Sequence, residues 1–64
     1  MDYTRLMMIT GMTMKELHQI PKVALYNIIK VMTERLERTY MRRDVREELS
    51  YQIACYDELM LTAK

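Results

Sequence analysis

Residues 42–48, with the sequence RRDVREE, decide the fold of this chain, because a basic stretch gives way to an acidic one there. Five arginines stand against two carboxylates between positions 35 and 46, whereas four carboxylates stand without a base between 47 and 58. The helix dipole favours cations at a helix C-terminus and anions at an N-terminus. The switch therefore predicts a junction between two helices, with Asp44 as the N-cap of the second helix and Glu47 completing a capping box.

Apolar residues repeat at steps of three and four on both sides of this junction. One stripe runs through Leu25, Ile29, Met32, Leu36 and Tyr40, and the other through Val45, Leu49, Ile53, Tyr56 and Met60. This period is typical of amphipathic helices. We predict two long helices, over about 22–42 and 45–62, that fold back as an antiparallel hairpin. One unbroken rod is the alternative, since no glycine or proline follows Pro21.

The first twenty residues carry weaker signals. Thr13 and Glu16 form a capping-box pair that predicts a short helix ending near residue 19 or 20, ahead of Pro21. Asp2 at its start and Gly11 just past its end favour another helix over residues 3–9. The same residues also fit a strand. The prediction is a single all-α domain, residues 1–64, in which one or two short helices precede the hairpin.

Size and composition limit how such a domain is stabilised. A chain of 64 residues is marginal as a lone monomer. Cys55 and His18 are the only residues of their types, so neither a disulfide nor a metal site is expected. The remaining way to stabilise the domain is self-association into a dimeric bundle or binding to another protein. A net charge of +1 makes nucleic acid a secondary partner.

No segment resembles a targeting signal or approaches the length needed to span a bilayer. One unpaired thiol suits a reducing compartment, so we expect a cytoplasmic protein that does not bind membranes. The sequence offers few residues that could serve as a catalytic nucleophile or base. Ser50 is the only serine and would need His18 beside it, while Cys55 lies in an apolar stretch that indicates a buried thiol. We therefore predict no enzyme activity and no cofactor.

Two groups of residues are candidates for binding a partner. Met7, Met8, Met12 and Met14 are more flexible apolar groups than a short helix is expected to cover, which favours a partner surface. Arg35, Arg38 and Arg42 have the spacing to share one helix face and to meet an acidic partner or phosphates. Neighbouring glutamates also explain these arginines by internal charge balance. The sequence thus predicts a small interaction module, a regulator or inhibitor of a larger complex.

Residues 16–30 allow an alternative interpretation as helix, turn and recognition helix, which resembles helix-turn-helix regulators. Leu17, Ile20, Val23 and Ile28 would then pack inward, and Lys22, Tyr26, Asn27 and Lys30 would face DNA. The pattern departs from that class at two positions. His18 stands where a small residue normally lets the helices approach, and Lys22 where glycine normally makes the turn.

Overall fold

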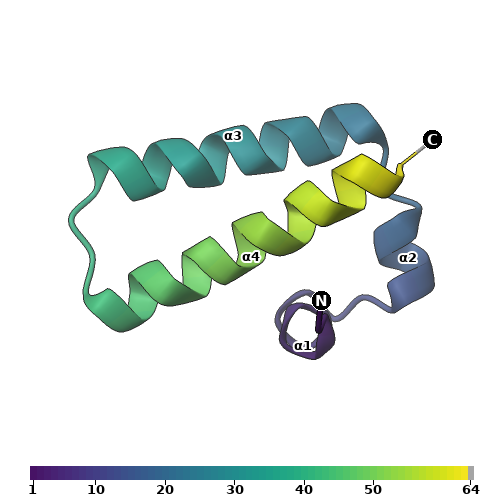
Figure 1. Ribbon diagram of the computed structural model, residues 1–64, viewed down its shortest axis with the longest axis horizontal. Coiled ribbons are helices and arrows are strands. Elements are labelled where there is room, and N and C mark those ends of the chain that lie inside the picture. The colour runs from purple at the N-terminus through teal and green to yellow at the C-terminus, as the bar shows by residue number, and fades with distance from the viewer. Residues whose placement is uncertain (64) are drawn as a thin grey trace.

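The computed structural model describes residues 1–63, which form four α-helices and no strand. The helices are α1 (Thr4–Thr10), α2 (Met14–His18), α3 (Lys22–Arg38) and α4 (Arg43–Thr62). α3 and α4 lie side by side and run in opposite directions, while α1 and α2 lie toward the end where α3 begins and α4 ends (Figure 1). The predicted all-α chain and helical hairpin are confirmed, and the unbroken rod is wrong.

Local signals place both short helices. The Asp2 carboxylate accepts a hydrogen bond from the Thr4 N–H at 2.9 Å at the start of α1. At its end, Gly11 adopts a left-handed conformation (φ 70°) and its N–H donates to the Met7 carbonyl at 2.8 Å. Thr13 and Glu16 make both bonds of a capping box before α2. The helix favoured over residues 3–9 is therefore found one residue later, at Thr4–Thr10, and the strand alternative is wrong.

The junction between the long helices differs from the prediction. α3 ends at Arg38 and α4 begins at Arg43, so Asp44 lies inside the first turn of α4 and is not its N-cap. The Asp44 carboxylate pairs with Arg42 at 2.9 Å, and Glu47 pairs with Arg43 at 3.3 Å. The predicted capping box is wrong because the neighbouring arginines engage both carboxylates. Asp44 still places negative charge at a helix N-terminus, where the dipole favours it.

The core lies where all four helices meet. Its buried side chains are Leu6 of α1, Leu17 of α2, Leu25 of α3, and Cys55, Tyr56 and Leu59 of α4. Most of the predicted stripe residues are only half-buried, and Val45 is exposed. Tyr40 is 97% exposed because α3 ends before it. The buried thiol predicted for Cys55 is confirmed.

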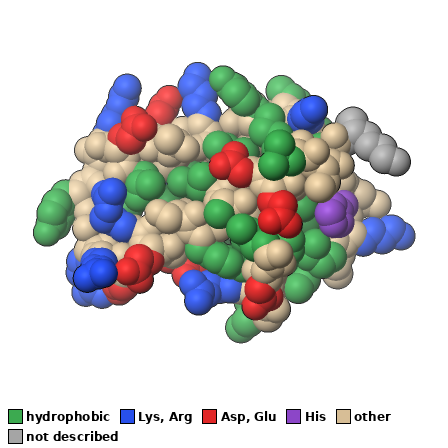
Figure 2. Space-filling view, in the orientation of Figure 1, with side chains coloured by type: hydrophobic (Ala, Val, Ile, Leu, Met, Phe, Trp, Pro, Cys, Tyr) green, Lys and Arg blue, Asp and Glu red, His purple; other side chains and the backbone are tan. Residues whose placement is uncertain are grey.

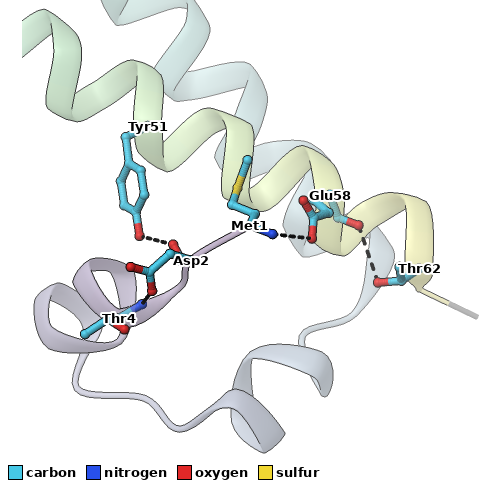
Figure 3. A network of polar contacts seen from close by, with 6 residues as sticks. All are labelled: Met1, Asp2, Thr4, Tyr51, Glu58 and Thr62. Atoms are coloured by element: carbon cyan, nitrogen blue, oxygen red, sulfur yellow. Dashed lines mark hydrogen bonds and ion pairs between the residues drawn. The ribbon is translucent and has the colours of Figure 1, made fainter.

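Tyr51 of α4 connects this helix to α1 through hydrogen bonds. Its hydroxyl donates to the Asp2 carbonyl at 2.7 Å and accepts from the Leu6 N–H at 3.3 Å (Figure 3). The Arg5 guanidinium lies 4.9 Å from the centroid of the Tyr51 ring and donates to Glu48 at 3.0 Å. Contacts to side chain and backbone together thus fix the position of a helix of only seven residues.

Three tyrosines of this contact region resist deprotonation. Burial, aided by the Glu58 carboxylate, raises the pKa of Tyr3 to about 12. Burial also raises the pKa of Tyr51 and of Tyr56, in both cases with a smaller contribution from Cys55. The folded chain therefore holds these phenolic protons more tightly than the unfolded chain does. By linkage, the stabilisation is fully present below pH 10 and is lost as the pH rises toward 12.

We expect Gly11→Ala to lower the free energy of unfolding by about 1 kcal/mol, because an L side chain is strained in the left-handed region. A Cβ at this position would meet no atom within 4 Å, so the loss reports backbone strain alone. Urea unfolding measures it. Gly11→Asn is the matched control and should lose less, since asparagine tolerates this conformation better. Equal stability of the alanine variant and the wild type would contradict the left-handed end of α1.

The raised tyrosine pKa values predict a stability that falls between pH 10 and pH 12. Tyr3→Phe should reduce this fall, because phenylalanine has no proton to release. The exposed Tyr40 provides the control, and Tyr40→Phe should leave the pH dependence unchanged. Urea midpoints compared at pH 8 and pH 11 decide the matter. An identical alkaline loss in wild type and Tyr3→Phe would show that Tyr3 is not responsible.

Candidate interaction surfaces

An open groove runs between α3 and α4 in the half of the hairpin nearer their connection. We call it the α3–α4 groove. It is lined by Asn27, Ile28, Val31, Met32 and Arg35 of α3, by Met41 of the connection, and by Asp44, Val45, Glu48, Leu49 and Gln52 of α4. No residue of α1 or α2 within residues 1–63 contributes to this lining. Val45 is 46% exposed and Val31 is 56% exposed, so apolar surface remains in contact with water.

The groove carries charge of both signs. Arg35 projects from α3, and Asp44 and Glu48 come from α4. One oxygen of Glu48 pairs with Arg5, whereas the other is buried and has no hydrogen-bond partner among the described residues. Both walls of the groove therefore offer ionic contacts beside the apolar ones.

The predicted arginine strip is divided by the fold. Arg35 and Arg38 belong to the last turns of α3, but Arg42 lies beyond its end and directly precedes α4. The expectation that the three share one helix face is wrong, because the helix stops four residues before Arg42. Only Arg35 lines the α3–α4 groove.

A second cluster lies where α3 and α4 are joined, and the sequence identified only Arg38 and Arg42 of it as candidate binding residues. Basic side chains gather at this end of the molecule (Figure 2). We call it the hairpin tip, defined by Arg38, Tyr40, Arg42, Arg43 and Arg46. Tyr40, Arg43 and Arg46 line one shallow depression there. The run of two arginines after an aromatic residue was the available signal, but the helix predicted through residue 42 concealed it.

Contacts within the protein hold the hairpin tip in place. The Arg46 guanidinium donates to the Leu36 carbonyl near the end of α3 at 3.2 Å, which ties the two helices together. The Arg42 guanidinium beside Asp44 holds the pKa of that carboxyl below its ordinary value. Ion pairs this exposed contribute little to stability. The arginines at the tip are thus positioned but readily available to another anion.

Three of the four candidate methionines pack against the core. Met7, Met12 and Met14 are half-buried there, and Met8 is left 79% exposed on α1. The short helices therefore cover more apolar surface than the sequence predicted. Partner binding by these methionines stays a prediction, with Met8 as its accessible member.

The face predicted to meet DNA is exposed along α3. Lys22, Tyr26, Asn27 and Lys30 all lie at the surface. Leu17 is buried and Ile20 and Ile28 are half-buried, in line with a helix-turn-helix core. Val23 is 69% exposed, so its expected inward packing is wrong. The reason is that Val23 lies almost opposite the buried Leu25 around the helix.

The side chains considered for catalysis differ in their exposure to solvent. Cys55 is buried, whereas Ser50 and His18 are exposed, one on α4 and one on α2. Among residues 1–63, no three acidic, histidine or cysteine side chains are grouped as metal ligands. None of the helices in that range is long and apolar enough to cross a membrane. Comparison of the chain with protein families, curated proteins and solved structures finds no match.

Proposed function

We propose that this protein is a small non-catalytic interaction module that forms a homodimer through the α3–α4 groove and regulates or inhibits a larger cytoplasmic complex. The observation that carries the proposal is the groove itself. It exposes Val31 and Val45 in a part of the hairpin that the short helices do not cover. Exposed apolar surface of this kind is typical of sites that bind another protein.

A second copy of the chain is the occupant that the composition supports. Among residues 1–63 only six side chains are buried, and chains of this size bury little of their surface alone. In a two-fold dimer the same groove is used twice. A standard interface covers about 800 Å² per subunit, which is about a sixth of the 4845 Å² that this chain exposes. One face of the hairpin is therefore sufficient for the contact.

Charge complementarity supports the same occupant. The groove presents Arg35 on one wall and Asp44 and Glu48 on the other. A second copy brings the opposite sign for each of these groups. A purely apolar partner would leave Arg35 unmatched when the groove is closed, and unmatched charge is costly to bury. Asp44 and Glu48 already pair with Arg42 and Arg5 within the chain.

The further protein partner would contact surfaces that the dimer leaves free. Met8 is the exposed member of the methionine group, and Met7, Met12 and Met14 are half-buried against the core. Flexible thioether side chains adapt to the shape of a partner, which suits a regulatory contact.

A helix-turn-helix DNA-binding regulator is the second candidate, and the exposed face of Lys22, Tyr26, Asn27 and Lys30 supports it. The exposure of Val23 and the shortness of α2, five residues, weigh against it. Helix-turn-helix units depend on close packing between the two helices. We therefore prefer the interaction module.

Two valine substitutions test the dimer. Val45→Asp places a charge in the groove, whereas Val23→Asp places the same charge on the outer side of α3. Both positions are exposed in the monomer, so folding should be unaffected. We expect Val45→Asp to raise the dimer Kd about 100-fold, equivalent to about 2.8 kcal/mol, and Val23→Asp to leave it unchanged.

Sedimentation at micromolar concentration measures the association, and far-ultraviolet circular dichroism checks the helices. The wild type should sediment at twice the monomer mass of 7.8 kDa. A wild type that remains a cooperatively melting 7.8 kDa monomer would remove the homodimer. Equal losses in both variants would place the interface outside the groove.

A further inference from the structure

Tyr40 at the hairpin tip has no packing role in the fold. It lies in the connection between α3 and α4 and is 97% exposed, the highest value among the large apolar side chains. An aromatic ring left this free in water gains by stacking on another flat group. Both faces of the ring are open to such a group.

Cations outnumber carboxylates around Tyr40, although Glu47 lines the same depression and Asp44 pairs with Arg42 beside it. Arg38 and Arg42 stand two residues before and after it in the sequence, and Arg43 shares its depression. The side chains of Arg42 and Arg43 are 80% and 91% exposed. The side chains of their carboxylate partners, Asp44 and Glu47, are 66% and 69% exposed, so a phosphate can replace them at little cost.

We propose that the hairpin tip binds single-stranded nucleic acid, with one base stacked on Tyr40 and the adjoining phosphates held by Arg38, Arg42 and Arg43. An aromatic platform flanked by cations is the arrangement by which proteins hold unpaired strands without reading their sequence. The site is separate from the proposed dimer and does not depend on it. It is also separate from the α3 face of the helix-turn-helix alternative.

The composition of the tip selects this ligand over a protein. An aromatic anchor of a protein interface is normally ringed by apolar side chains that exclude water. Tyr40 has arginines around it instead, and its apolar neighbour Met41 is half-buried. Stacking also selects single strands over duplexes, because the faces of paired bases are already covered by their neighbours.

The small number of cations limits the affinity. Three phosphate contacts on a single strand predict that raising the salt from 50 to 200 mM weakens binding about 20-fold. A dissociation constant of about 10⁻⁴ to 10⁻⁶ M is typical of such sequence-independent contacts. The tip thus provides a weak, salt-sensitive attachment.

Fluorescence anisotropy of a labelled twelve-residue oligothymidylate, titrated with the full-length protein, tests the proposal. Tyr40→Ala should weaken binding about tenfold through loss of one stacked base. Tyr26→Ala is the matched control, since Tyr26 is also exposed but lies in the first half of α3. It should bind like the wild type.

Two double variants show whether binding depends on the location of the cations or only on the net charge of the protein. Arg38→Glu with Arg42→Glu and Lys22→Glu with Lys30→Glu change the net charge equally. Only the first pair should abolish binding, and amide shifts in the wild-type NMR spectrum should fall within residues 38–47. A duplex of the same length should bind more weakly than the single strand.

Three results would overturn the proposal. One is an absence of saturable binding up to millimolar protein. Another is an equal loss in both double variants, which would show attraction by charge alone. The third is a larger loss from Tyr26→Ala or the lysine pair, which would assign nucleic acid to the α3 face. Circular dichroism confirms folding throughout, and the altered side chains are all exposed.

Discussion

Cys55 and Leu59 lie about one turn apart on α4, and both are fully buried although neither belongs to the stripe that continues from Leu49 through Tyr56. Their burial shows that α4 packs on two sides at once. α3 covers the stripe, while α1 and α2 cover the neighbouring side through Leu6 and Leu17. The two short helices are too short to be stable alone, so their structure depends on this second contact. Without it the chain would be a bare two-helix hairpin.

That contact also explains the uneven distribution of the core. The six buried side chains of the core lie where α1 and α2 reach the hairpin, and the apolar residues in the half near the connection are half-buried or exposed. The bond from Arg46 to the Leu36 carbonyl closes this less-packed end. An exposed hydrogen bond aligns the two helices but buries little apolar surface and adds little stability. The groove and the tip are therefore consequences of where the short helices stop.

The sequence predicted those features that depend on a few neighbouring residues. The capping box of Thr13 and Glu16 and the left-handed Gly11 are local, and both are found as expected. The Asp44 cap failed because Arg42 competes for the same carboxylate, a choice that composition does not reveal. The burial of Leu59 off the apolar stripe, and the exposure of Tyr40 past the end of α3, depend on tertiary packing. The sequence identified the methionines and arginines as candidate binding residues. It did not predict that Arg35 lines the groove while Arg38 and Arg42 belong to the tip.

Met41 connects the two proposed surfaces. This half-buried residue lines the α3–α4 groove on one side and the depression beside Tyr40 on the other. A subunit seated in the groove would fix the Met41 side chain and so reduce the freedom of the connection that carries Tyr40. Ordering of a loop in one binding event lowers the entropy lost in the next. If both surfaces are used, dimerisation and strand binding should therefore favour each other, although no residue belongs to both contacts except Met41.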